Sequence, residues 1–308
     1  MNEKKISVFT PAFNRMGTLP QLYESLVEQT YKNFEWIIID DGSTDGTEEL
    51  VNGWIIERRI DIVYKKQSNN GKHIAMNNAV SLATGYFITV VDSDDFLKKE
   101  ALRILIDAWN EIPTEEWKSY ISVKSNCFDI YTGESLGPSF KNGFLVCNYL
   151  DARYKYKVNA EMQSLIRIEA LREYPNPNIL GGYQNGGLRY YPETIWQDLA
   201  ARKYLTKFIS ESTCGYRMDS SESLLGRGKK YNRYRENFYL WKHIINDNSD
   251  YFWYSPKEFF KAYVGFSMDL FFNHYSIKNA LGEIDSIGKQ IICVLFIPLG
   301  YVAYLIKS

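Results

Sequence analysis

The sequence predicts an α/β protein with a mostly parallel, Rossmann-like central sheet, followed by a C-terminal helical extension. Strand and helix patterns alternate repeatedly in the first third of the chain, and acidic clusters directly follow two of the predicted strands. Successive βα units of this kind are typical of a parallel sheet with helices on both faces. Ligands of such sheets bind beyond the carboxyl ends of the strands, where the acidic clusters are expected.

Four strands are predicted, at residues 6–9, 36–39, 60–64 and 86–91. Residues 36–39 are continuously apolar, as expected for a strand that is covered on both faces. Each strand is followed by apolar residues at helical spacing. These sets are Leu19, Leu22 and Leu26; Leu50, Val51, Trp54 and Ile55; Ala75, Ala79, Leu82 and Ala83; and Leu97, Ala101, Leu105 and Ala108.

The pattern changes after residue 112. Short strands are expected near residues 119–130, and residues 175–187 form a loop rich in Gly, Asn and Pro. From residue 231 onward the pattern is mainly helical and ends in a strongly apolar segment. We therefore expect residues 1–220 to form one α/β domain in two halves, 1–112 and 113–220, and residues 221–308 to form the helical extension.

Composition restricts the classes of function. The chain has 308 residues, 45% of them hydrophobic, and a formal net charge of −1, so nothing indicates a nucleic-acid partner. Its four cysteines are far apart and form no CxxC pair, which disfavours a zinc or redox site and fits a reduced, cytoplasmic setting. The charged N-terminus runs straight into a strand and does not resemble a signal peptide.

Asp92 and Asp94 are candidate metal ligands. They are one residue apart at the end of the strand at 86–91, and Asp95 follows them. Mg²⁺ and Mn²⁺ prefer carboxylate and phosphate oxygens as ligands. The alternative is a turn rich in Asp that caps the next helix. The strand-end position, with a second acidic strand end at Asp40 and Asp41, favours a metal site.

Several blocks in the first hundred residues resemble family 2 glycosyltransferases. The blocks are Thr10-Pro11-Ala12-Phe13-Asn14-Arg15, Asp40-Asp41-Gly42-Ser43-Thr44-Asp45-Gly46-Thr47, Asn70-Gly71-Lys72-His73 and Ala83-Thr84-Gly85-Tyr86, which leads into Asp92-Ser93-Asp94-Asp95. Beyond this region the resemblance is looser and rests on Gln197-Asp198. The family implies the nucleotide-sugar transferase fold called GT-A. Residues 1–112 would then bind the nucleotide-sugar, and residues 113–220 would face the acceptor.

The resemblance implies roles for the residues of the nucleotide site. Pro11 and Phe13 match the loop that cradles the base, although many family members have Tyr in place of Phe13, and Asn14 matches the residue that steadies this loop. Asp41, with Asp40 beside it, matches the carboxylate that accepts the imide N–H of the base. This pairing favours uridine or thymidine donors.

The resemblance also implies the metal and catalytic residues. Asp92 and Asp94 match the metal and ribose motif, with Asp94 as the principal ligand of Mn²⁺ or Mg²⁺, and Asp198 matches the catalytic base. A cation bridging the two phosphates would stabilise the leaving group, while a carboxylate on the opposite side would deprotonate the acceptor in a single, inverting displacement. Lys72 follows Gly71 at a helix start and is a candidate ligand of the diphosphate, or else an ordinary surface lysine.

Other parts of the family pattern are missing. The Gln-x-x-Arg-Trp motif of processive synthases does not occur, so repeated polymerisation is not expected. No histidine stands out as a late third metal ligand, and His243 and His274 are expected to be structural. Asp198 itself has a plainer interpretation, as a solvated carboxylate on a helix that also carries Trp196.

Two other functions are consistent with the same fold. A sugar-1-phosphate nucleotidyltransferase would normally carry a Gly-rich, basic loop after the first strand, where this chain has Thr10-Pro11-Ala12. A non-catalytic carbohydrate-binding protein would have no need of three carboxylates in one crevice. Both are less consistent with the sequence than a glycosyltransferase that acts on a glycan or lipid-linked acceptor in surface-polysaccharide synthesis.

The apolar C-terminus predicts association with the cytoplasmic face of the cell membrane. Residues 291–306 carry no charge. As a helix they would be about 24 Å long, shorter than the ~30 Å hydrocarbon core, and we expect Pro298 and Gly300 to interrupt them, so that they would not span the bilayer. Upstream, basic residues alternate with tyrosines between residues 227 and 235, which suits an anionic lipid surface. The alternative is a core or dimer helix formed by residues 287–306.

Overall fold

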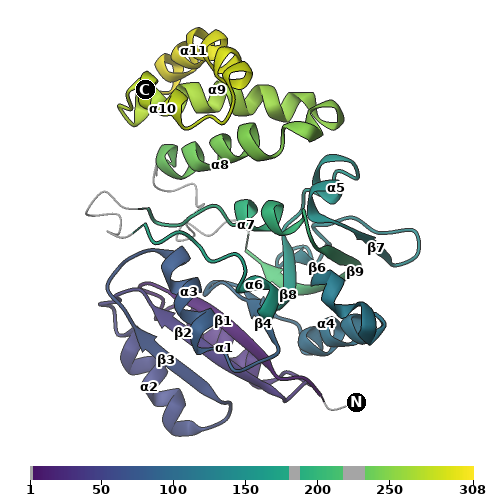
Figure 1. Ribbon diagram of the computed structural model, residues 1–308. Coiled ribbons are helices and arrows are strands. Elements are labelled where there is room, and N and C mark those ends of the chain that lie inside the picture. Colours follow the sequence, from purple (N-terminus) through teal and green to yellow (C-terminus); the bar gives the residue numbers. More distant parts are fainter. Residues whose placement is uncertain (1–2, 180–187, 218–232) are drawn as a thin grey trace.

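The computed structural model describes residues 3–179, 188–217 and 233–308 (Figure 1). In this part of the chain, strands and helices alternate through the N-terminal half and helices alone form the C-terminal end. The N-terminal elements are β1 (Ile6–Ala12), α1 (Leu19–Val27), β2 (Phe34–Asp40), α2 (Thr47–Glu57), β3 (Ile62–Lys66), α3 (Lys72–Leu82), β4 (Phe87–Val90), β5 (Phe96–Leu97), α4 (Ala101–Asn110) and the short 3-10 helix η1 (Thr114–Ser119).

The second half of the chain completes the sheet and adds a helical layer. Its elements are β6 (Tyr120–Asp129), β7 (Phe144–Cys147), α5 (Tyr149–Tyr154), β8 (Met162–Arg167), α6 (Ile168–Leu171), α7 (Glu193–Ala200), β9 (Leu205–Tyr216), α8 (Tyr234–Asp247), the 3-10 helix η3 (Ser249–Tyr254), α9 (Pro256–Phe272), α10 (Ile277–Gly282) and α11 (Ile287–Lys307). The basic stretch at 227–232 lies outside the described residues.

One mixed sheet of nine strands runs through the described residues, in the order β3-β2-β1-β4-β8-β6-β9-β5, with β7 also paired to β9. The strands β1, β2, β3, β4, β6 and β9 run in the same direction, whereas β5, β7 and β8 run against them. The predicted α/β class with a mostly parallel sheet is therefore confirmed. The carboxyl ends of β1, β2 and β4 meet at one edge, so the acidic clusters are neighbours.

The apolar strands are buried on both faces, as their continuous hydrophobic pattern predicts. Along β2, Trp36 and Ile38 join a core formed with α1, α2 and α4, while Ile37 and Ile39 join a second core with α3 and α7. All four side chains are fully buried. The alternation follows from the two-residue repeat of a strand, which points successive side chains to opposite faces.

Two details differ from the sequence-based expectations. Leu97 was expected to begin a helix, but it lies in β5 and pairs with Cys214 of β9, and the helix begins only at Ala101. Pro298 and Gly300 were expected to interrupt the C-terminal helix, but α11 is continuous over 21 residues with Pro298 inside it. Leu97 belongs to the hydrophobic core. An apolar residue would be buried there in a helix or in a strand, so its hydrophobic character did not distinguish the two.

The C-terminal helices form a layer that stacks on the sheet domain beside α5 and α7 (Figure 1). Their core includes Phe259 and Phe266 of α9 and Cys293 of α11, and it also takes in Leu150 and Tyr154 of α5. Because one apolar core contains side chains of α5 and of the C-terminal helices, the helical layer packs directly against the sheet domain at α5.

Candidate active site

The carboxylates at the end of β2 hold the neighbouring loops. Asp40 accepts hydrogen bonds from the backbone N–H of Ser43 at 2.7 Å and from the Tyr64 hydroxyl at 2.5 Å. Asp41 accepts from Gln67 at 2.8 Å and from the backbone N–H groups of Asn70 and Gly71 at 2.8 and 2.9 Å. Burial raises the pKa of Asp41 despite these donors. Asp41 therefore organises the loop that leads into α3.

Gly71 is required by the backbone at the start of α3. Its φ is +91°, and an added Cβ would lie 2.6 Å from the carbonyl oxygens of Leu188 and Arg189. The next residue, Lys72, donates its backbone N–H to the Arg189 carbonyl at 2.8 Å. The Asn70-Gly71-Lys72 block thus joins the N-terminal half of the sheet domain to the segment that precedes α7.

The loop after β1 is tied to the loop after β2 by Asn14. The backbone N–H of Asn14 donates to Ser43 Oγ at 2.8 Å, and its side-chain oxygen accepts from the backbone N–H of Thr44 at 2.9 Å. Asn14 has a φ of +55°, a conformation that asparagine tolerates better than most residues. Pro11 pairs with Ile39 inside the sheet, and Phe13 presents a half-exposed ring. Pro11 thus lies near the end of β1, and Phe13 and Asn14 lie in the loop that follows it.

The acidic cluster after β4 lies beside Lys72. The Lys72 ammonium pairs with Asp92 at 2.8 Å and with Glu193 of α7 at 3.1 Å. Burial, followed by the negative charges of Asp92 and Asp94, raises the pKa of Asp95 to about 8. Carboxylates that disfavour one another's ionisation form a site that a cation would stabilise.

The described residues can supply only part of the coordination shell of Mg²⁺ or Mn²⁺. Asp92 and Asp94 supply hard oxygen ligands, but the described residues contain no group of three His, Cys, Asp or Glu side chains arranged to hold a metal ion. Mg²⁺ commonly takes one or two protein carboxylates and completes its shell with water and substrate phosphates. The residues present are compatible with that mode of binding.

A cavity of about 300 Å³ opens next to this cluster. Of the residues predicted from the sequence, Lys72 and Asp92 line it, whereas Asp94, Asp198 and the residues of the β1 and β2 loops do not. Its other walls come from α3, α5, α7, β6, β8 and β9. Among the lining residues are Lys124, Tyr149, Glu161, Gln163, Tyr191 and Glu193.

Lys124 and Glu161 are titratable groups of the cavity that sequence reasoning missed. Lys124 donates to Gln197 Oε1 at 2.8 Å, and its ammonium lies 4.4 Å from the centre of the Tyr149 ring. Burial lowers the pKa of Lys124 to about 8, and burial together with the charge of Glu193 raises the pKa of Glu161. Lys124 lies in β6 and Glu161 directly precedes β8, and nothing in the sequence indicates that these two side chains line the same cavity.

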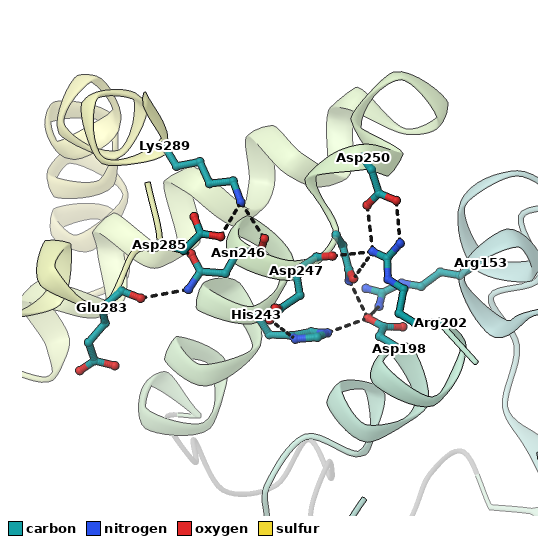
Figure 2. A network of polar contacts seen from close by, with 11 residues as sticks. Arg153, Asp198, Arg202, His243, Asn246, Asp247, Asp250, Glu283, Asp285 and Lys289 are labelled. Atoms are coloured by element: carbon teal, nitrogen blue, oxygen red, sulfur yellow. Dashed lines mark hydrogen bonds and ion pairs between the residues drawn. The ribbon is translucent and has the colours of Figure 1, made fainter. Parts of the chain in front are cut away.

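Asp198 is fully buried at the contact between α7 and the helical layer (Figure 2). Its Oδ2 atom accepts hydrogen bonds from Asn248 at 2.7 Å and from Arg153 and His243, each at 3.3 Å. Among the described residues, its Oδ1 atom has no hydrogen-bond partner. The interpretation of Asp198 as a solvated surface carboxylate is therefore wrong. His243 was expected only to be structural. Its spacing of four residues from Asp247 on one helix could have indicated that pair, but not the contact with Asp198.

A sequence model described as "Glycosyl transferase family 2" matches residues 7–116, which contain the loops after β1, β2 and β4. The N-terminal part of the chain is a family 2 glycosyltransferase domain. It is 36% identical over 100 residues to the glycosyltransferase GlyG of Streptococcus pneumoniae and 37% identical over 98 residues to the putative teichuronic acid biosynthesis glycosyltransferase TuaG of Bacillus subtilis. Each match covers 32% of this chain, and 33% of GlyG or 38% of TuaG.

Solved structures extend the likeness to nearly the whole chain at the level of the fold. Staphylococcus aureus TarS residues 1–349, in complex with UDP-GlcNAc, superposes with a TM-score of 0.60 at 17% identity, covering 96% of this chain and 89% of that one. The mannosyltransferase PcManGT of Pyrobaculum calidifontis, in complex with GDP-Man and Mn²⁺, has a TM-score of 0.53 at 15% identity, covering 96% of this chain and 80% of that one. The family 2 domain thus has the predicted GT-A fold.

Proposed function

We propose that this protein transfers a sugar from a nucleoside diphosphate sugar to a hydroxyl group of a glycan or lipid-linked acceptor in surface-polysaccharide synthesis. One observation carries the proposal: the loops after β1, β2 and β4 and the start of α3 gather at one sheet edge, next to a cavity lined by Lys72, Asp92 and Glu193. A uridine donor is supported by the TarS complex and by the paired Asp40 and Asp41.

We assign residues 1–112 to the nucleotide-sugar and residues 113–220 to the acceptor side. In the nucleotide half, Pro11 and Phe13 would cradle the base, Asn14 would steady their loop, and Asp41, with Asp40 beside it, would accept the imide N–H of the base. Lys72 would bind the diphosphate without leaving Asp92 and Glu193, because an ammonium has three N–H donors and these two carboxylates need only two of them. In this role the lysine is a ligand whose partners hold it ready at the cavity wall.

A divalent cation would be held by Asp94 and Asp92 and would supply neutralising charge to the diphosphate as it leaves. The PcManGT complex with Mn²⁺ supports this assignment. The protein residues would fix the donor, exclude water and orient the acceptor hydroxyl.

Asp198 is our candidate for the base. It would take the acceptor proton while the acceptor oxygen bonds to the anomeric carbon and the bond to the diphosphate breaks, so that one displacement inverts the configuration. Asp198 has no exposed surface, so this role requires the bound acceptor to reach a covered oxygen. Glu193 is the competing candidate, because it lines the cavity directly.

The C-terminal layer is proposed to hold the enzyme at the inner face of the cell membrane. By length and composition, α11 is the one helix among the described residues that could cross a bilayer, and only 11% of its most apolar window is buried. Cys293 and Gly300 pack against the rest of the layer, which leaves the opposite side of the helix exposed. The exposed side chains include Ile287, Ile291, Val294, Leu295, Leu299, Val302, Leu305 and Ile306. A helix held on one side and apolar on the other suits the bilayer surface.

A donor screen tests the proposed function. Thermal shift and hydrolysis are measured with UDP-, dTDP- and GDP-sugars, each with and without Mn²⁺, and a UDP-sugar with Mn²⁺ is expected to give the largest stabilisation. Asp198→Asn and Glu193→Gln are then compared in the same assay. Loss of the base is expected to reduce turnover by about 10²–10⁴-fold with donor affinity nearly unchanged. If no nucleotide-sugar stabilises or is consumed by the protein, the proposal is wrong.

A further inference from the structure

The carboxylate of Asp198 is held from the helical layer rather than from its own domain alone. Asn248 and His243 reach it from the C-terminal side, and Arg153 reaches it from α5 (Figure 2). Three donors converge on one oxygen, Oδ2, and the other oxygen is left without a partner among the described residues. An arrangement of this kind fixes the rotation of the carboxylate and leaves one oxygen for another ligand.

His243 has carboxylate oxygens at both ring nitrogens. Its Nε2 lies 3.3 Å from Asp198 Oδ2, and its Nδ1 lies 2.8 Å from Asp247 Oδ2. Ionised carboxylates only accept hydrogen bonds, so both contacts are satisfied at once only when both ring nitrogens carry protons. Burial disfavours this imidazolium, but the hydrogen bonds to Asp198 and Asp247 outweigh burial and raise the pKa of His243.

Cationic side chains from neighbouring elements face the two carboxylates that contact His243. Arg153 faces Asp198 from α5, and Lys289 of α11 and Arg202, which follows α7, both act on Asp247. Arg202 is itself bound to Asp250 of η3 at 2.6 and 2.8 Å, and it also contacts the Asp247 carbonyl oxygen at 2.5 Å. The imidazolium therefore sits between two carboxylates in a network whose outer members are also paired (Figure 2).

We propose that His243, as an imidazolium, and Asn248 are positioning residues that orient Asp198 for proton abstraction, and that the C-terminal helical layer is thereby part of the catalytic apparatus. The proposal rests on the function of Asp198 proposed above. The acceptor proton goes to Oδ1, and His243 keeps its own proton throughout. Deprotonation of His243 at alkaline pH removes one donor and the positive charge, so turnover falls on the alkaline side as the pH passes the pKa of His243.

The protonation state can be measured without any activity assay. The chain has three histidines, so a sample with ¹⁵N-labelled histidine gives three imidazole signals, which substitutions at His243 and His274 assign. In the wild type we expect the carboxylates at both ring nitrogens to favour the imidazolium, so that His243 titrates above the ordinary value of 6.5. Asp198→Asn removes one facing charge and is expected to lower the pKa of His243. A wild-type His243 that titrates at or below 6.5 overturns the proposal, and this measurement does not depend on the folding of any variant.

The catalytic consequence is tested with His243→Gln, because glutamine keeps an N–H donor near the ring Nε2 position but carries no charge. We expect kcat to fall about tenfold to a hundredfold, with the KM for the donor unchanged. This is the range found for residues that hydrogen-bond to metal-ligating side chains and orient them. The alkaline limb of the kcat profile should also disappear. His274→Asn is the matched control, since His274 is exposed and asparagine tolerates its φ of +52°.

The outcomes separate this proposal from the proposed function. If His243→Gln retains the kcat and pH profile of the wild type, His243 does not position the base. If Glu193→Gln abolishes turnover while Asp198→Asn does not, the base assignment has failed, even where His243 titrates as expected. Loss of both kcat and the alkaline limb in His243→Gln, with the control unaffected, supports the positioning role.

Discussion

Glu35 offers the clearest quantitative test of how the family 2 domain is held together. This carboxylate is buried near the start of β2. It accepts hydrogen bonds from Ser7 at 2.6 Å, from Lys5 at 2.8 Å and from both the backbone N–H and the hydroxyl of Thr84 at 2.8 Å. Burial alone would raise its pKa, but these donors outweigh burial and lower the pKa from 4.5 to about 2. The Thr84-Gly85 block is therefore fastened to β1 and β2 through one ionised side chain.

The expected cost of Glu35→Gln follows from this shift. A change from 4.5 to about 2 corresponds to about 3 kcal/mol of stability at ~1.4 kcal/mol per pH unit. Glutamine keeps one acceptor oxygen, so we expect the free energy of unfolding at pH 7 to fall by about 2–3 kcal/mol. A depressed pKa stabilises the fold above the unfolded value of 4.5, and this stability is lost as the pH falls toward about 2.

Urea unfolding at pH 7 and pH 3.5 measures both effects. The carboxylate contributes about 3 kcal/mol at pH 7 but only about 2 kcal/mol at pH 3.5, so the gap between wild type and Glu35→Gln should narrow by about 1 kcal/mol. Glu24→Gln is the control, because Glu24 pairs with Arg59 at the exposed surface, where such pairs contribute less than about 1 kcal/mol. A cost below about 0.5 kcal/mol, or a gap that does not change with pH, would refute the argument.

Three further predictions concern the metal, the helical layer and the membrane. Asp94→Ala should abolish transfer and the Mn²⁺-dependent part of UDP binding measured by calorimetry; undiminished wild-type activity in EDTA would contradict it. Gly300→Ala should lower the unfolding free energy by about 1–3 kcal/mol in denaturant melts, because the added Cβ would lie 2.4 Å from a side chain of α9, whereas Gly288→Ala in the same helix meets nothing within 4 Å. Leu295→Glu should release the protein from membranes in fractionation, whereas Ile56→Glu on the remote, equally exposed surface of α2 should not; the opposite result would exclude α11 as the anchor.

Local sequence was sufficient for the parts of the fold that follow from strand direction. The continuous apolar run at Ile37–Ile39 predicts a strand buried on both faces. Because β1, β2 and β4 are parallel, their carboxyl ends lie at the same edge of the sheet. For that reason Asp41 and Asp94 could be assigned to the same edge of the sheet although they are far apart in sequence. The Asn70-Gly71-Lys72 block was recognised by its resemblance to the family. The reason for its glycine came from the structure, where Gly71 has a φ of +91° and leaves no room for a Cβ.

The tertiary structure alone decided what surrounds Asp198. Sequence periodicity gives the face of a helix that is buried but not the element that covers it, so it placed His243 on a helix without revealing the carboxylate across from it. The stacking of α8 on α5 and α7 brings Arg153, Asn248 and His243 to one oxygen, and it depends on an apolar core shared by both layers. Lys124 and Glu161 escaped prediction for the same reason, because their direction toward the cavity is fixed by strands that meet only in the folded sheet. Local patterns thus determined the sheet and the edge where its acidic clusters lie, whereas contacts between distant segments determined which side chains surround Asp198 and line the cavity.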